Sequence, residues 1–187
     1  MRREFAKNLH AAMKKDERIF LITADLGYGV LNDIRRDFPK RAINIGSSEM
    51  LMVGIAVGLA QSGFIPICYS ITPFLLYRPF ELIRNYMNYE GATVKLVGSG
   101  RDDDYAHDGI SHWAGDDIDI MSALKHIKLY KPKDNTEMDT IFNTFIYNNN
   151  KKRAVHPTSA WITWDIPPGI SLEGGAVFFS VHNGFRP

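Results

Sequence analysis

Short, largely apolar runs recur along this sequence and alternate with segments whose apolar residues follow helical spacing. Such runs occupy residues 19–24, 65–70 and 94–98, and helical patterns occupy, for example, 3–15 and 49–61. A strand that lacks a polar face is covered on both sides, as in a parallel sheet. The alternation therefore predicts an α/β fold whose mainly parallel sheet is flanked by helices.

The same patterns predict the remaining elements and their caps. Ser47 or Ser48 is expected to cap the helix that follows, and Asn135 or Thr136 the last helix. Further strands are expected at 42–45 and 127–130, and further helices at 31–38, 79–90, 116–124 and 138–147.

Length and pattern together predict the domain organisation. A chain of 187 residues holds little more than one domain, and we expect that domain over residues 1–150, where strands and helices alternate. In residues 151–187, prolines and glycines interrupt two short apolar runs at 160–164 and 176–181. We expect this segment to be an atypical tail, either irregular or translated out of its ancestral reading frame.

The composition excludes several classes of protein. The sequence has 22 Lys and Arg residues and 21 Asp and Glu residues, so its net charge is +1, whereas a nucleic-acid binder needs a basic surface. No apolar run reaches the roughly 18 residues of a membrane helix. The single cysteine, Cys68, suits a reducing compartment. We therefore expect a cytoplasmic protein that binds neither nucleic acid nor membranes.

Several familiar ligand-binding motifs are absent or incomplete. Gly27-x-Gly29 follows a predicted strand, but the third position of a dinucleotide fingerprint is Asn32. No phosphate-binding loop of the G-x-x-x-x-G-K-[ST] form occurs. The acidic segment 102–117 offers carboxylates and imidazoles whose spacing fits neither a calcium loop nor a zinc pair on one helix face. We expect a solvated loop there and no metal site in this chain.

Glu49 is the unusual residue of the pattern, because it opens an otherwise apolar helix after Gly-Ser-Ser. A first-turn carboxylate is favoured by the helix dipole and can simply be solvated. Enclosed between an apolar helix and a strand end, however, the carboxyl group would be desolvated and suited to share a proton at neutral pH. Gly54 and Gly58 lie on one face of the same helix, which suggests that a strand or a partner helix packs closely there.

Spaced motifs in the first 150 residues point to a family. The motifs are Asp25-Leu26-Gly27, Asn44-Ile45-Gly46-x-x-Glu49-x-x-Met52-x-Gly54-x-Ala56-x-Gly58, Phe74-x-x-x-Arg78, Asp108-Gly109-x-Ser111-His112 and Asp117-Ile118-x-x-Met121. Together they resemble the pyrimidine-binding domain of transketolases, over residues 1 to about 150.

The resemblance implies thiamine diphosphate as the cofactor. In that family the glutamate matching Glu49 hydrogen-bonds the aminopyrimidine ring and favours its imino tautomer, whose exocyclic nitrogen deprotonates the thiazolium carbon. Phe74 matches the aromatic residue that stacks on the pyrimidine, and Tyr77 extends that aromatic wall. Asp25, in the family's first strand-end motif, is the fourth residue expected to bind the cofactor. The alternative for Phe74 is plain core packing.

The resemblance also implies a substrate side. Asp108 and His112 match residues near the hydroxyl groups of a sugar, and we expect His112 to act in catalysis with Glu49. The alternative for Asp108 and His112 is a solvated pair in a loop.

Four positions depart from the family and make the sugar reaction less secure than the cofactor. A substrate-contacting histidine falls on Gly100, and a serine falls on Gly29. A glutamine falls on Trp113, and a glutamate on His107.

The resemblance further implies a partner. In this family another domain holds the diphosphate through magnesium with a Gly-Asp-Gly motif, which is missing here. We therefore expect one subunit of a split transketolase-like enzyme, in a homo- or hetero-oligomer whose diphosphate-binding subunit carries the magnesium. Such an enzyme would transfer a two-carbon ketol unit between sugars. The alternatives are an enzyme that acts on a 2-oxo acid such as pyruvate, and a non-catalytic partner that only completes an interface.

Overall fold

The computed structural model describes residues 1–148 and 176–181. Helices and strands alternate along most of the chain, as the sequence predicts. The elements are α1 (Arg2–Lys15), β1 (Ile19–Thr23), α2 (Asn32–Asp37), β2 (Ala42–Asn44), α3 (Glu49–Gln61), β3 (Ile65–Ile71), α4 (Thr72–Tyr77), α5 (Phe80–Leu82), a π-helical stretch (Ile83–Tyr89), β4 (Lys95–Ser99), two 3₁₀ turns (Ala106–Asp108 and Ile110–His112), α6 (Asp117–Ser122), β5 (Ile127–Tyr130), α7 (Asn135–Tyr147) and β6 (Ala176–Val181).

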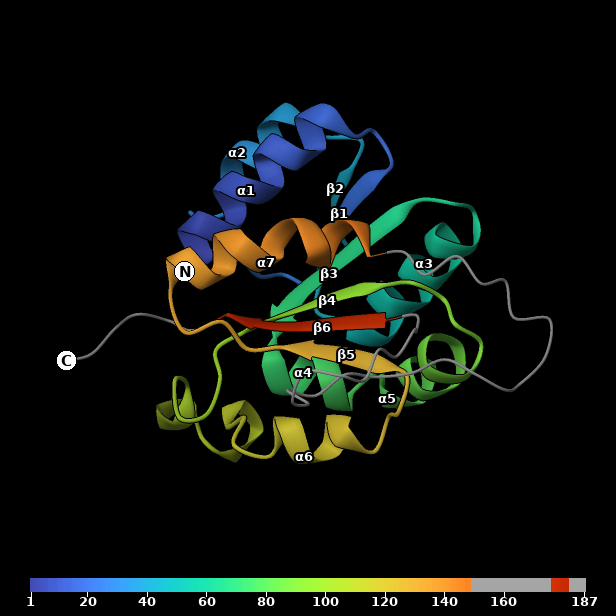
Figure 1. The fold of residues 1–187 in the computed structure, drawn as a ribbon. Helices are drawn as coiled ribbons and strands as arrows, with labels where there is room; N and C mark the ends of the chain where they lie inside the picture. Colours follow the sequence, from blue (N-terminus) through green and yellow to red (C-terminus); the bar gives the residue numbers. More distant parts are fainter. Residues whose placement is uncertain (149–175, 182–187) are drawn as a thin grey trace.

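The strands form one parallel sheet in the order β2-β1-β3-β4-β6-β5. Helices α1, α2 and α7 cover one face, and α3 to α6 cover the other (Figure 1). Neighbouring strand residues point to opposite faces. Leu21 and Ile67 accordingly join the core under α1 and α7, while Ile22 and Cys68 join the core under α3. This double coverage is the reason why the strands read as apolar runs without alternation, and the predicted fold class is confirmed.

Strand β6 is an addition that the sequence pattern does not predict. Residues 176–181 pair in parallel with both β4 and β5, so a segment of the expected tail fills the place between these strands. The remainder of the tail, 149–175 and 182–187, lies outside the described residues. The hypothesis that the tail is translated out of its ancestral reading frame concerns residues near 155, which are also outside the described part. The division of the chain at residue 150 stays a prediction.

Local differences from the predicted elements have identifiable causes. The sequence reading missed α4, which follows β3 directly with Pro73 in its first turn. Helix α7 begins earlier than predicted, because the Asp134 carboxylate accepts the backbone N–H of Glu137 and takes the cap expected of Asn135 or Thr136. Ser48 does occupy the N-cap position of α3, but its side chain makes no capping hydrogen bond.

The glycine face of α3 is not packed against a strand. A Cβ on Gly54 would meet only Leu82, at 3.7 Å, and a Cβ on Gly58 would meet nothing within 4 Å among the described residues. The sequence suggested that either a strand or a partner helix packs closely on these glycines. Among the described residues, the prediction of a close strand is wrong. Met50 and Leu51, on the first turn of α3, are 44% and 52% exposed. None of the described helices is long and apolar enough to cross a membrane.

Candidate active site

The candidate site lies where the chain reverses its direction across the sheet. From β1 the chain goes to β2 on one side and then returns to β3 on the other side. In open parallel sheets, ligands bind at such a switch point, beyond the carboxyl ends of the strands. Three segments that follow strand ends meet here: the start of α3 after β2, α4 after β3, and the loop after β4. They supply Glu49, Phe74 and His112 respectively.

Glu49 is a buried carboxylate with two partners. Its side chain is 2% exposed. The Ser70 hydroxyl, near the end of β3, donates to Oε1 at 2.9 Å, and Nη1 of Arg78 donates to Oε2 at 2.7 Å. The first turn of α3 adds its positive dipole end. The structure thus encloses Glu49 as the sequence suggested, but it also gives the carboxylate a cationic partner.

Phe74 presents its ring beside this carboxylate. The guanidinium carbon of Arg78 lies 3.7 Å from the ring centroid, and the His112 ring meets the phenyl ring edge-on with centroids 4.8 Å apart. Helix α4 is tethered to the end of β4, because the Thr72 hydroxyl donates to the carbonyl of Gly100. Gly98 leaves the room for Thr72, since a Cβ there would overlap the threonine side chain. These contacts fix α4, and with it Phe74, against the sheet.

The structure therefore brings Glu49, Phe74 and His112 together, whereas the other three predicted residues make their hydrogen bonds elsewhere. The Tyr77 hydroxyl donates to Asp116, and burial together with this carboxylate raises the pKa of Tyr77. Asp25 accepts from Tyr28 at 2.7 Å, and that hydrogen bond lowers the pKa of Asp25.

Asn44 adds a second, longer bond to Asp25 at 3.3 Å. Asp108 lies in an exposed loop, with Oδ2 at 3.4 Å from Nε2 of His107. Asp25 and Asp108 thus lie in segments that also follow strand ends, and the contacts named above join them to residues other than Glu49 and Phe74.

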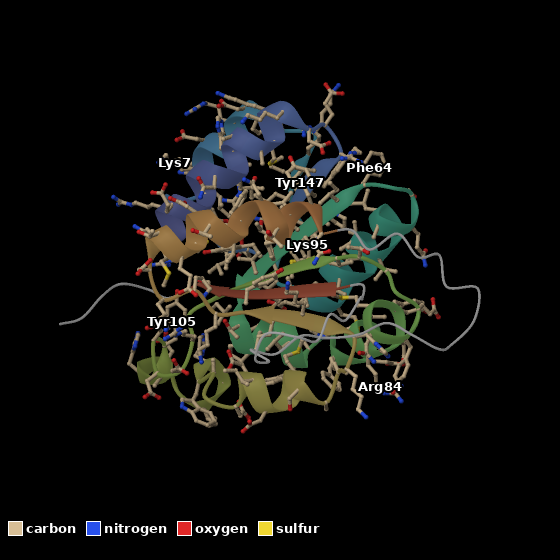
Figure 2. The ribbon with its side chains drawn as sticks, viewed as in Figure 1. Lys7, Phe64, Arg84, Lys95, Tyr105 and Tyr147 are labelled. Carbon is tan, nitrogen blue, oxygen red and sulfur yellow. The ribbon has the colours of Figure 1, made fainter. Side chains whose placement is uncertain are left out.

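Gly100 has a neighbour that sequence reasoning missed. Its φ is +77°, and a Cβ at this position would overlap the ring of Tyr105. The Tyr105 hydroxyl lies 3.2 Å from the Ser99 hydroxyl and accepts from Arg2 at 3.3 Å (Figure 2). Tyr105 therefore takes the room that a side chain on Gly100 would need. A glycine at a strand end, five residues before a tyrosine, is too weak a signal to predict this packing.

Two further residues of the site, Ser70 and Arg78, had no predicted role. Ser70 is a polar residue, 1% exposed, near the end of an otherwise apolar strand, and this is a signal that a buried hydrogen-bond partner exists. Arg78 belonged to a recognised motif, but the motif does not say which carboxylate it meets.

Trp113 lies within its own loop, where its ring packs on Gly115 and its Nε1 donates to Asp103 at 3.0 Å.

The donor set fits an aminopyrimidine better than a metal ion. One guanidinium touches both the Glu49 carboxylate and the Phe74 ring, so a planar group with N–H donors spans these two partners. Such a group is what an aromatic face and a buried carboxylate bind. Among residues 1–148, no group of three or more His, Cys, Asp or Glu side chains is arranged to hold a metal ion.

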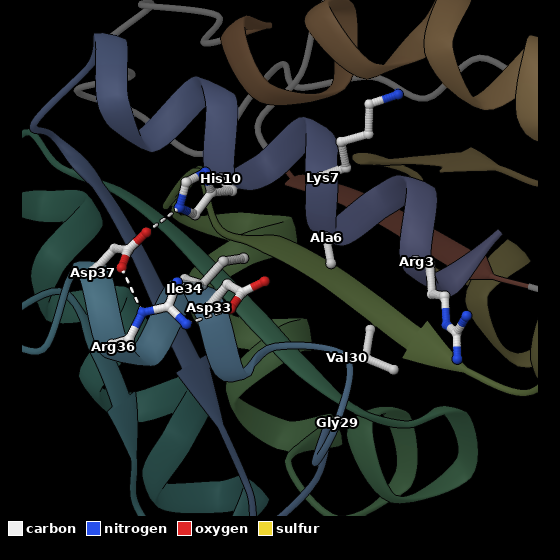
Figure 3. Close-up of a pocket in the computed structure, with 10 residues that line it drawn as sticks. All are labelled: Arg3, Ala6, Lys7, His10, Gly29, Val30, Asp33, Ile34, Arg36 and Asp37. Carbon is white, nitrogen blue, oxygen red and sulfur yellow. Dashed lines mark hydrogen bonds and ion pairs between the residues drawn. The ribbon is translucent and has the colours of Figure 1, made fainter.

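A pocket between α1 and α2 is distinct from this site. It measures about 420 Å³ (Figure 3). Two of its basic side chains are paired with carboxylates, because His10 and Asp37 are 2.7 Å apart and Arg36 bridges Asp33 and Asp37 at 2.7 and 2.9 Å.

Comparison with known proteins identifies the family of this chain. Residues 1–156 match the transketolase pyrimidine-binding domain. A Methanocaldococcus jannaschii protein provisionally named a transketolase C-terminal section is 32% identical over 145 residues, which cover 77% of this chain and 46% of that protein. A 6-deoxy-6-sulfo-D-fructose transketolase subunit of Clostridium sp. strain MSTE9 is 32% identical over 130 residues, or 69% of this chain and 40% of that protein. This chain thus spans less than half the length of either relative.

A solved structure shares the fold. A split-gene transketolase described as an inactive beta4 tetramer aligns over 96% of this chain and 49% of its own, with a TM-score of 0.70 and 24% identity. Transketolases are thiamine-diphosphate enzymes, and the carboxylate and aromatic face found here suit the pyrimidine end of that cofactor. The chain belongs to the transketolase pyrimidine-binding domain family.

Proposed function

We propose that this chain is a subunit of a thiamine-diphosphate-dependent, transketolase-like enzyme that transfers a two-carbon ketol unit between sugars. The observation that carries the proposal is the Glu49 carboxyl group, which is 2% exposed. The guanidinium of Arg78 contacts both this carboxylate and the Phe74 ring, so the two groups are near neighbours. A buried carboxyl group beside an aromatic face can share a proton with a stacked, nitrogen-containing ring.

Each residue of the cluster has a definite task in this proposal. The bound cofactor would supply the thiazolium carbon that attacks a ketose carbonyl. Glu49 holds a proton against a ring nitrogen of the aminopyrimidine, and Ser70 fixes the other carboxylate oxygen. Phe74 stacks on the ring and keeps water from it. His112, edge-on to Phe74 at 4.8 Å between centroids, is placed to hold or move a proton at a substrate hydroxyl.

The flanking residues take lesser tasks. Tyr77 extends the aromatic wall while its hydroxyl is held by Asp116. Asp25 contributes at the cofactor edge of the cluster, and Asp108 holds substrate hydroxyls from the loop that carries His112.

A partner subunit completes the cofactor site in this proposal. The sequence contains no Gly-Asp-Gly motif, so the diphosphate and its magnesium are assigned to another chain in a homo- or hetero-oligomer. The name of the Clostridium relative, a transketolase subunit, supports this division. The exposed Met50 and Leu51 at the start of α3 stand beside Glu49 and suit such a contact.

The second candidate is a thiamine-dependent reaction on a 2-oxo acid such as pyruvate. It is favoured by Gly100, where Tyr105 fills the room of the expected sugar-contacting histidine. A non-catalytic role as an interface partner is the third outcome that the experiment below distinguishes.

The decisive experiment uses the chain reconstituted with its diphosphate-binding partner. Glu49→Gln should slow exchange of the thiazolium C2 proton, followed by NMR, by about 10²–10⁴-fold, the usual contribution of a proton relay. Glu81→Gln, an exposed glutamate in α5, is the matched control and should leave exchange unchanged. Near-normal exchange in Glu49→Gln would contradict the proposed role and support the non-catalytic reading.

Steady-state kinetics then identify the reaction. Xylulose 5-phosphate with an aldose phosphate acceptor tests ketol transfer, and pyruvate tests the 2-oxo acid alternative. A kcat/KM of about 10⁴ M⁻¹s⁻¹ or more with the sugars would mean that a side chain at Gly100 is dispensable.

The partner requirement has its own measurement. Without the diphosphate half of the site, the chain alone should bind thiamine diphosphate weakly. Micromolar affinity of the isolated chain in calorimetry would refute the divided site.

A further inference from the structure

Arg78 contacts both groups on which the proposed pyrimidine site depends. Its guanidinium carbon lies 3.7 Å from the Phe74 ring centroid, and its Nη1 lies 2.7 Å from Oε2 of Glu49. The comparable cation–π contact of Arg84 over Tyr89 is longer, at 5.0 Å. The planar head of Arg78 thus lies over the aromatic face with an N–H directed at the buried carboxylate.

The guanidinium has the features of an aminopyrimidine that this site would recognise. Both are planar, both present nitrogens bonded to a shared carbon, and both can be held by stacking and by a carboxylate at once. Because Glu49 is 2% exposed, its carboxylate needs a partner, and Arg78 supplies one. The two ligands therefore compete for the same face and the same oxygen.

We propose that Arg78 is an internal stand-in for the aminopyrimidine, and that ring binding requires its displacement from Phe74 and Glu49. This inference rests on the function proposed above. The Arg78 side chain is 46% exposed, whereas Glu49 is enclosed, so the arginine can swing into solvent while the carboxylate remains. Displacement also releases Glu49 from its ion pair with Arg78 and leaves the carboxyl group free to share a proton with the incoming ring.

Competition of this kind lowers the apparent affinity for the ring by the fraction of molecules in which the site is open. Arg78 is 46% exposed, and we expect its cation–π contact and its ion pair together to keep the site closed in about nine of ten molecules, which weakens binding by about tenfold. Removing the guanidinium should therefore strengthen binding, although it removes a residue from the site. A residue that only helped to bind the ligand would have the opposite effect.

The test titrates the full-length chain with 4-amino-5-hydroxymethyl-2-methylpyrimidine, the ring portion of thiamine, and follows the Phe74 and His112 signals by NMR. Arg78→Gln should lower the dissociation constant about tenfold relative to wild type. Arg84→Gln, an exposed arginine stacked on Tyr89 (Figure 2), is the control and should not change it. In wild type, the Nε–Hε signal of Arg78 should move to a solvent-exposed value as the pyrimidine saturates.

The outcomes separate this inference from the function on which it rests. An equal or weaker affinity in Arg78→Gln, with the Phe74 and His112 signals still responding, overturns displacement but leaves the pyrimidine site intact. An Arg78 signal that stays unchanged at saturation does the same. If the pyrimidine perturbs neither Phe74 nor His112 in any variant, the pyrimidine site and the displacement fail together.

Discussion

Replacing Lys95 by methionine should stabilise the protein. Lys95 begins β4 and is 0% exposed on the α7 side of the sheet (Figure 2). Its ammonium donates to the carbonyl of Asn148, just after α7, at 3.1 Å. Burial lowers the pKa of Lys95 from 10.5 to about 7. Methionine keeps the unbranched stem and removes the amine, so packing is largely retained.

The size of the gain follows from the pKa. A lowering of about 3.5 units at 1.36 kcal/mol per unit means that the buried amine costs about 5 kcal/mol up to about pH 7, where the native lysine is protonated as well, and progressively less as the pH rises towards 10.5. The Asn148 carbonyl, at the negative end of α7, offsets about 1–2 kcal/mol of that cost. We expect Lys95→Met to raise the free energy of unfolding by about 3–4 kcal/mol at pH 7.

The pH dependence provides a sharper signature. Between pH 7 and 10.5 the unfolded chain binds a proton on Lys95 that the native state lacks, so wild-type stability should rise with pH across this window. Below pH 7 both states bind the proton and this contribution no longer changes. Lys95→Met should lack the slope.

Urea unfolding followed by circular dichroism, at pH values from 6 to 10, measures both effects. Lys14→Met, an exposed lysine of α1, is the control and should keep the wild-type slope. A Lys95→Met protein that is less stable than wild type at pH 7, or that retains the same pH slope, would refute the reasoning.

Three smaller predictions concern single positions. Gly100→His should lower the free energy of unfolding by about 2–4 kcal/mol, because the new side chain would overlap Tyr105 and because the backbone φ at this position is positive. Adding Tyr105→Ala to the same chain should recover part of the urea midpoint, and no recovery would speak against the overlap. Asp117 is 1% exposed and burial raises its pKa, so Asp117→Asn should raise the free energy of unfolding by about 1–3 kcal/mol at pH 8. This gain should shrink as the pH falls through the raised pKa, because the native carboxyl takes up its proton before the unfolded one; a gain independent of pH would contradict this account. Asp134→Ala should cost about 0.5–2 kcal/mol as a lost helix cap, whereas Asn135→Ala should cost almost nothing, and equal losses in thermal unfolding would show that the cap is misassigned.

The fold class and the position of the key carboxylate could be predicted from the sequence. Successive residues of a strand face opposite sides of the sheet, so a run that is apolar at every position, such as 19–24, indicates that both faces are buried. Glu49 stands out for the same local reason, as a charge that opens an apolar helix. The expectation that it is enclosed agrees with its 2% exposure.

The partners of that carboxylate required the tertiary structure. Arg78 is 29 residues from Glu49, and Ser70 is 21 residues away. Neither spacing follows a helical or strand period, so no local pattern connects these residues. The ion pair exists because α3 and α4 meet at the switch point of the sheet.

Long-range pairing likewise decided the place of β6 and the room at Gly100. Residues 176–181 read only as a short apolar run, and their insertion between β4 and β5 depends on hydrogen bonds to strands about 50 to 80 positions earlier in the chain. Tyr105 fills the space over Gly100 because the loop after β4 folds back on the strand end. The sequence by itself determined the fold class and most of the helices and strands, since these depend on local period and polarity, but it did not determine α4 or β6. The tertiary structure alone decided which distant side chains meet, because that depends on the order in which the strands assemble.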